Sequence, residues 1–345
     1  MKPLRFILTA LGVFAVLAAM YLAAFGWALQ QPVWPYHWLR NVYVVKDRLA
    51  REASAPRCLI LGGSSVWFGF QGGLLEKATG QHVINLGTHA EVPLEFQLWQ
   101  AERLARRGDT VLFAGELVYY WPRAPYTTYA ATEVMLMAPD FWRQSSLRGK
   151  YELLAAIPPT RVVTGIVSWA HRGTKSYAEH LRLSSSDELM ENLRARWAGT
   201  FQGALPSHYN YLEMDSHGDI VRPRVQAPHP HEDYGLASKH VESAEIWRRF
   251  GEFARTMQAR GVRCVATWPP FERHAGFDLD AAPVRANLDF LRSHLTAAGW
   301  EVIGEPEDGA MTSEFFYDTP YHLTTEGARL RTERLAARWR TVGEK

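Results

Sequence analysis

Short runs of mostly apolar residues, rich in branched and aromatic side chains, recur along the chain. They cover 58–62, 82–87, 110–115, 263–268 and 300–304. The first three, "CLILG", "HVINLG" and "TVLFAG", each end at a glycine. Because they lack the strict alternation of a half-exposed strand, these runs are typical of strands buried on both faces of a parallel sheet.

Helical periodicity separates the strand-like runs. A helical pattern over 95–108 closes at Gly108, and another fills 324–340. Two further segments repeat apolar residues at intervals of three and four: Ile246, Phe250, Phe253 and Met257, then Val284, Leu288, Leu291 and Leu295. Strands that alternate with helices predict an α/β fold, here a three-layer αβα domain around a mostly parallel five-stranded sheet.

The alternation fails between about 121 and 240. This stretch is rich in Tyr, Trp, Pro and His and contains two helical patterns and a hairpin-like segment, at 146–157, 184–197 and 211–223. A structureless loop of this length would be unusual in a compact domain. We therefore expect a large insertion between the third and fourth strands, helical with irregular parts.

A long uncharged segment lies near the N-terminus. Residues 6–29 hold no charged side chain and exceed the ~20 residues that cross a hydrocarbon core. Lys2 and Arg5 precede this segment and no basic residue follows it until Arg40, which favours an N-terminus in the cytoplasm. A cleaved signal peptide is the alternative, but the run is long for one. The sequence predicts three parts: an anchor over 1–30, a linker over 31–56, and an extracytoplasmic domain over 57–345.

Charge and cysteine content exclude several function classes. The formal charge of +2 is carried by Lys2 and Arg5, since residues 1–30 contain no acid and the remainder is formally neutral. Such a balance gives no electrostatic footprint for nucleic acid. Two cysteines are too few for a disulfide framework. Cys58 and Cys264 each lie in a strand-like run, so we expect buried thiols, with a single disulfide as the alternative.

The stretch "LILGGSSVWFGF" (59–70) is the strongest candidate for chemistry. It follows the first predicted strand but carries no Gly-x-Gly-x-x-Gly dinucleotide motif and no Lys-Ser/Thr pair of a P-loop. Its serines are not framed as Gly-x-Ser-x-Gly, which excludes the α/β-hydrolase nucleophile turn. Gly63, Ser64 and Ser65, with Gly69 four positions later, resemble the first block of the SGNH (GDSL-like) hydrolase superfamily.

Other segments extend this resemblance in the same chain order. "YDTPYH" supplies Asp318 and His322 with the spacing of the superfamily's last block, before a C-terminal helix, and Gly87 after the second strand matches the second block. The resemblance covers about 57–119 and 262–340. It implies a nucleophilic Ser65, with His322 as its base and Asp318 orienting the imidazole. It also implies an oxyanion hole formed by the amides of Ser65 and Gly87.

Two departures from the superfamily pattern narrow the expected function. Ser64 stands where the first block has an aspartate, and "AGELVYYW" replaces the third block, so the asparagine that completes the oxyanion hole is missing. Together with the anchor and the insertion, these departures make the chain similar to the branch of the superfamily that O-acylates cell-surface polymers. This branch includes alginate O-acetylation proteins and DltD proteins. The resemblance implies transfer of an acyl group through a serine ester to a polysaccharide, beside a membrane-bound O-acyltransferase that delivers the acyl group.

The expected protein is thus an O-acyltransferase, first of all an O-acetyltransferase, anchored in the bacterial cytoplasmic membrane with its catalytic domain in the periplasm and without a cofactor. An esterase of the same fold, or a non-catalytic subunit of a polysaccharide modification or export complex, are the alternatives. Four further side chains are candidates for lining the substrate site: Ser64, His89, Glu116 and Trp268. No metal is expected, and "HPHED" (229–233) is interpreted as a surface loop.

Overall fold

The computed structural model describes residues 2–32, 37–121, 126–175, 182–203, 205, 209–238 and 243–343. The chain divides into two compact units. The smaller contains 1–40 and 125–184, and the larger contains 41–124 and 185–345. The larger unit carries every residue predicted for the site.

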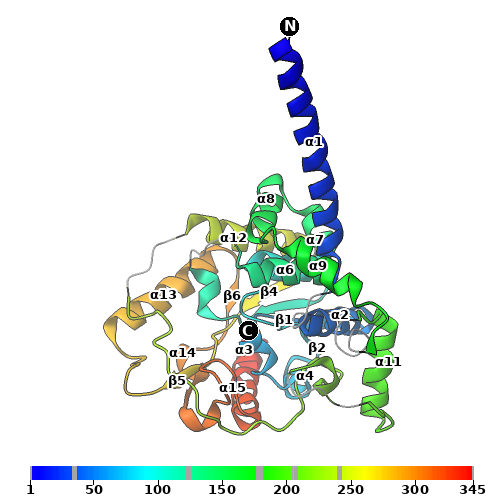
Figure 1. Ribbon diagram of the computed structural model, residues 1–345. Coiled ribbons are helices and arrows are strands. Elements are labelled where there is room, and N and C mark those ends of the chain that lie inside the picture. Colours follow the sequence, from blue (N-terminus) through cyan, green and yellow to red (C-terminus); the bar gives the residue numbers. More distant parts are fainter. Residues whose placement is uncertain are drawn as a thin grey trace. The chain divides into compact units, whose positions relative to one another are not determined.

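A parallel five-stranded sheet forms the centre of the larger unit (Figure 1). Its strands are β1 (Arg57–Leu61), β2 (His82–Asn85), β3 (Thr110–Phe113), β4 (Arg263–Ala266) and β6 (Glu301–Val302), in the order β2-β1-β3-β4-β6. This order is that of doubly wound sheets, in which ligands bind at the carboxyl ends of strands where the order reverses. Here the reversal lies between β1 and β3.

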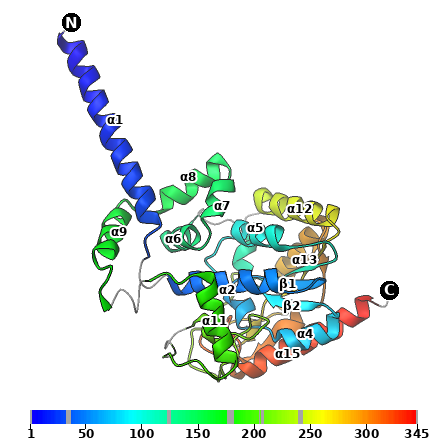
Figure 2. The same cartoon turned by 90° about the vertical axis from the view of Figure 1, so that its right-hand side faces the viewer.

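Helices cover both faces of this sheet (Figure 2). On one face lie α5 (Leu94–Leu104), α12 (Ala244–Ala259) and α13 (Ala282–Ala297); on the other lie α4 (Gly72–Thr79) and α15 (Thr325–Gly343). Phe113, Phe250 and Trp300 pack edge to face on the first side, with ring centroids 5.2 and 5.6 Å apart for Phe113–Phe250 and Phe250–Trp300. Trp339 and Leu335 of α15 join the buried cluster on the second side. Apolar burial on both faces explains the uniformly apolar strands.

The prediction of a mostly parallel five-stranded α/β sheet is confirmed. Strand β1 is as long as its apolar run and displaced by one residue, and the other four strands are two or three residues shorter than theirs. The predicted periodic helices are also present. The elements that the patterns did not predict include α4 and a second sheet of two parallel strands, β5 (Phe271–Arg273) and β7 (Ala310–Thr312). Strands of three residues are too short to show a period. The predicted linker contains a helix, α2 (His37–Glu52).

A buried ion pair ties β1 to the segment before β3. Arg57 and Asp109 are both fully buried, and Arg57 Nε donates to Asp109 Oδ2 at 3.1 Å. Asp109 Oδ1 also accepts from the Arg57 amide at 2.8 Å, and Oδ2 accepts from the Arg106 amide at 2.8 Å. These bonds satisfy both charges where no water reaches them.

Replacing Asp109 with asparagine will lower the free energy of unfolding by about 3 kcal/mol or more, because the Arg57 charge is left buried without a counter-charge. Thermal and urea unfolding of the full chain in detergent, followed by circular dichroism, measure the loss. Asp140→Asn is the matched control, since it breaks an exposed pair with Arg143 whose side chains are 64% and 68% exposed. Equal midpoints for the two variants would contradict the prediction.

The remaining described elements of the larger unit are short apart from α11 (Ser186–Trp197). They are α3 (Ser64–Trp67), α14 (Pro306–Gly309), η1 (Leu117–Tyr120), η2 (Tyr211–Glu213) and η3 (Ser313–Phe315). The hairpin-like segment forms an antiparallel bridge between Met214 and Ile220. Cys58 and Cys264 are both buried and free, as the first of the two interpretations expects.

The smaller unit is helical. It contains α1 (Lys2–Leu29), α6 (Thr128–Met137), α7 (Pro139–Gln144), α8 (Leu147–Ala156) and α9 (Arg161–Ala170). In the part of the chain that the structure describes, α1 is the one helix long and apolar enough to cross a membrane by itself. Helices α8 and α9, which meet at 69°, pass the same test only as a bent pair. Gly165 of α9 lets α1 approach closely, because a Cβ there would lie 2.7 Å from the Ala28 Cβ.

Candidate active site

Two strand ends at the reversal point carry the predicted site. The turn Gly62–Gly63 follows β1 and leads directly into α3, which begins at Ser64. Glu116 follows β3, the neighbour of β1 in the sheet. The carboxyl ends of parallel strands meet at one edge, so these two segments lie together where doubly wound sheets bind ligands.

Glu116 accepts hydrogen bonds from the serine turn, the segment 62–65 that joins β1 to α3. Its fully buried carboxylate accepts hydrogen bonds from the amides of Gly63 at 2.9 Å and Ser65 at 2.7 Å. The Ser64 hydroxyl lies 3.5 Å from the same carboxylate. A carboxylate that accepts two amide bonds fixes the local backbone. The sequence analysis names Glu116 as a candidate lining residue, and the structure places it in direct contact with the turn.

Two glycines permit this close packing. A Cβ at Gly63 would lie 2.7 Å from both carboxylate oxygens of Glu116 and 2.6 Å from the Ala90 Cα. A Cβ at Gly87 would lie 2.6 Å from the Trp67 amide nitrogen. Both glycines are therefore required by steric contact between the β1 turn and the segments after β2 and β3.

The two serines differ in exposure. Ser65 is fully buried, and its Oγ has no hydrogen-bond partner among the residues that the structure describes. Ser64 is half-buried at the start of α3. A buried hydroxyl without a partner is unusual and requires an explanation, of which a catalytic role is one. Since the hydroxyl is buried, a bound molecule would contact Ser65 Oγ only after neighbouring side chains move.

His322 and Asp318 form the expected pair. His322 Nδ1 donates to Asp318 Oδ1 at 2.7 Å, because a carboxylate only accepts, and this fixes the tautomer with the lone pair on Nε2. Tyr209 donates its hydroxyl to Asp318 Oδ2. Burial alone would raise the pKa of Asp318, but the hydrogen bonds from His322 and Tyr209 outweigh it and hold this pKa below its ordinary value.

Phe68 connects this pair to the serine turn. Its ring stacks on the His322 imidazole with centroids 4.1 Å apart and planes at 9°. Arg224 also joins these two segments, since its guanidinium donates to the Phe68 carbonyl at 3.2 Å and to the Leu323 carbonyl at 3.0 Å. The structure thus brings Ser65, Asp318 and His322 into one region, without a hydrogen bond from Ser65 Oγ to His322.

Both amides predicted for the oxyanion hole already have acceptors. The Ser65 amide donates to Glu116, and the Gly87 amide donates to Asn85 Oδ1 at 2.9 Å. A substrate oxyanion would have to displace these groups, and the Glu116 carboxylate opposes a second negative charge beside it. In this structure the two amides are therefore engaged rather than presented to a substrate.

A buried polar network that the sequence analysis missed lies behind Gly87. Lys46 of α2, fully buried, donates to the Gly87 carbonyl at 2.6 Å, and Asn85 Nδ2 donates to Asp219 Oδ1 at 2.7 Å. Burial holds the pKa of Lys46 well below its ordinary value, although Asp219 opposes this shift. The polar Asn85 within the apolar run "VINLG" could have indicated a buried polar contact from the sequence. A lysine in an amphipathic helix gives no such indication.

The α15 helix supplies a further buried contact. Arg331 donates to the Ser65 carbonyl at 2.9 Å and to the Trp268 carbonyl at 2.9 Å. Burial lowers the pKa of Arg331, and the nearby Glu116 carboxylate opposes this. The guanidinium therefore ties the carbonyl side of the serine turn to the end of β4.

The other candidate lining residues occupy different positions. His89 lies in the loop before α5, where its Nδ1 accepts from the Glu91 amide at 3.2 Å. The Trp268 side chain is buried, donates to the Gly304 carbonyl at 3.1 Å and carries the Arg292 guanidinium 5.3 Å from its ring centroid. Its ring is therefore packed against protein, an arrangement that differs from an open platform for a sugar.

Comparison with known proteins adds no assignment to this geometry. No known family model matches the sequence, and no curated protein is significantly similar to it.

Proposed function

We propose that this protein is an extracytoplasmic, membrane-anchored acyltransferase that carries an acyl group on Ser65 and passes it to a hydroxyl of a polysaccharide. An acetyl group is the first choice of acyl group. The observation that carries the proposal is the Asp318–His322 hydrogen bond beside the serine turn, since it leaves Nε2 of His322 as a base.

The proposed reaction has two steps. Ser65 Oγ attacks the acyl carbonyl of the donor while His322 Nε2 takes the hydroxyl proton, and the donor's leaving group departs with that proton. A sugar hydroxyl then attacks the serine ester, giving its proton to His322, and Ser65 Oγ recovers a proton as it leaves. Asp318 stabilises the imidazolium in both steps.

The anchor supports attachment of the protein to a membrane. The α1 helix is long and apolar enough to cross a bilayer, and Lys2 and Arg5 precede its apolar part. We propose that the larger unit lies in the periplasm of a bacterium, where a membrane-bound O-acyltransferase would supply the acyl group to Ser65.

Mass spectrometry of the full chain in detergent micelles tests the proposal. The protein is incubated with an activated acetyl ester, with and without alginate or another candidate polysaccharide. An added acetyl mass on the 59–70 segment, lost to the polysaccharide, supports the acyltransferase. Loss to water alone supports an esterase, and the absence of any serine ester would overturn the catalytic proposal.

A non-catalytic polysaccharide-binding subunit is the second candidate. The contact between the Glu116 carboxylate and the Ser65 amide favours it, because this contact occupies a donor that acyl transfer would need. Binding of the polysaccharide without any serine ester, equal in the wild type and in Ser65→Ala, is the result that this candidate predicts.

A further inference from the structure

A second group of titratable side chains lies outside the candidate active site. It consists of His229 and His231, which flank Pro230, and Glu272 of β5. The Glu272 side chain is fully buried, that of His229 is 2% exposed, and that of His231 is 53% exposed. The segment 229–233 is a surface loop, as interpreted from the sequence, although the His229 side chain is buried.

The protonation of His229 follows from its neighbours. Its Nδ1 lies 3.0 Å from the Ala227 carbonyl oxygen, which only accepts, so Nδ1 carries the proton. In the neutral ring, Nε2 then holds a lone pair. This Nε2 lies 3.2 Å from Glu272 Oε2, and it makes no hydrogen bond with any residue that the structure describes.

A lone pair that faces a buried carboxylate is repulsive unless a positive charge lies between them. A metal ion supplies that charge, and histidine ligands of metals commonly donate their other ring N–H to a backbone carbonyl, as His229 does. His231 Nδ1 lies 3.0 Å from the same Glu272 oxygen. Ligand atoms of a tetrahedral Zn²⁺ at about 2.0–2.1 Å from the ion lie about 3.3 Å apart, close to both separations.

We propose that His229 Nε2, His231 Nδ1 and Glu272 Oε2 bind one divalent transition-metal ion, Zn²⁺ in the first instance, with water completing the coordination. Two imidazoles and one carboxylate suit zinc better than magnesium, which prefers oxygen ligands. His274 stacks on His231 with centroids 4.7 Å apart. It is not a ligand, because its Nε2 donates to the Glu232 carbonyl and its Nδ1 accepts from the Gly276 amide.

The proposed ion would brace the loop that carries Asp318 and His322. The Ala227 amide donates to the Tyr317 carbonyl at 2.6 Å. Tyr234 donates to the Pro320 carbonyl at 3.1 Å and accepts from the Glu272 amide at 2.7 Å. A metal ion bound by 229–231 and by Glu272 of β5 would therefore hold in place the residues that donate hydrogen bonds to the 317–322 loop. This holds whatever reaction that loop serves.

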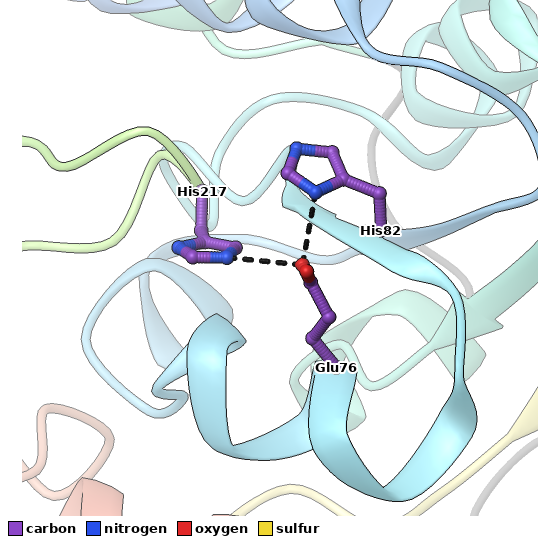
Figure 3. A group of neighbouring side chains, drawn as sticks. All are labelled: Glu76, His82 and His217. Carbon is purple, nitrogen blue, oxygen red and sulfur yellow. Dashed lines mark hydrogen bonds and ion pairs between the residues drawn. The ribbon is translucent and has the colours of Figure 1, made fainter.

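A comparable cluster elsewhere serves as an internal control. Figure 3 shows Glu76 of α4 between His82 of β2 and His217, with Oε2 at 2.9 Å from His82 Nδ1 and 3.1 Å from His217 Nε2. Here a proton supplies the charge: the hydrogen bond and charge of Asp215 raise the pKa of His217 to about 9. Glu76 is also 38% exposed. This group is an ion-pair cluster and we expect it to hold no metal.

Metal retention by the full chain in detergent micelles tests the proposal. The chain is stripped with EDTA, incubated with Zn²⁺ or Mg²⁺, desalted and analysed by inductively coupled plasma mass spectrometry. We expect about one Zn²⁺ and no Mg²⁺ per chain, and an affinity lowered more than about 100-fold in His229→Asn, His231→Asn and Glu272→Gln. His82→Asn, in the control cluster, is expected to retain zinc as the wild type does.

His231→Asn keeps the test decisive if the buried variants fail to fold, because its side chain is largely exposed and circular dichroism reports its fold. Zinc retained by folded His231→Asn as well as by the wild type would overturn the proposal. So would a wild type that retains no zinc, which would show that a proton on an imidazole neutralises Glu272.

Discussion

Replacing Ser65 with alanine is expected to abolish serine acylation and to lower acyl transfer more than about 10³-fold, because in the proposed reaction the Ser65 oxygen is the group that attacks the acyl carbonyl. The variant should fold normally. The Ser65 Oγ makes no hydrogen bond with a described residue, so its removal breaks none. Acetyl labelling followed by mass spectrometry, with circular dichroism of the same samples, measures both effects.

Ser64→Ala is the matched control for this variant. Ser64 precedes Ser65 on α3 and is half-buried, and its hydroxyl lies 3.5 Å from the Glu116 carboxylate. We expect Ser64→Ala to keep acylation within about tenfold of the wild type, since it loses at most one long hydrogen bond. Labelling that disappears in Ser64→Ala and persists in Ser65→Ala would assign the nucleophile to Ser64 instead.

Replacing Asp318 with asparagine should lower acyl transfer by about 10⁴-fold while the protein stays folded. Asparagine has one accepting oxygen where the carboxylate has two, so it cannot accept from both His322 Nδ1 and Tyr209. Its amide NH2 can instead donate to Nδ1 and favour the tautomer that carries the proton on Nε2. Tyr209→Phe separates the two contacts. It removes only the phenol bond to Asp318, and a loss of about tenfold is expected. Initial rates with the activated ester measure both variants, and equal losses in the two would contradict the assigned roles.

The acid limb of the stability profile should also depend on Asp318. Its pKa lies below the ordinary value when folded, so the carboxylate stabilises the fold above about pH 4, and this contribution disappears as pH falls through the folded pKa. Midpoints of thermal unfolding between pH 3 and 7 report it. The wild type should lose more stability than Asp318→Asn over the acid part of this range, and parallel curves would contradict the expectation.

Short-range signals in the sequence were sufficient for the sheet. Apolar runs such as 58–62 and 110–115 predicted strands because burial on both faces leaves no polar positions. The resemblance to the last SGNH block also implied that Asp318 pairs with His322, and the two side chains do share a hydrogen bond. The same reasoning missed β5 and β7, whose three residues carry no measurable period.

What the sequence alone determined is therefore local: the parallel α/β sheet, the apolar N-terminal helix, the serine turn and the Asp–His pair. Tertiary structure decided which side chains from distant segments fill the space around them. Glu116 accepts a hydrogen bond from the Ser65 amide, Lys46 donates to the Gly87 carbonyl, and Glu272 lies beside His229. The members of these pairs are 51, 41 and 43 residues apart along the chain. Such contacts depend on how strands and helices pack. The partner of a buried polar or charged group lies near it in space and far from it in sequence, so the pair produces no periodic pattern along the chain.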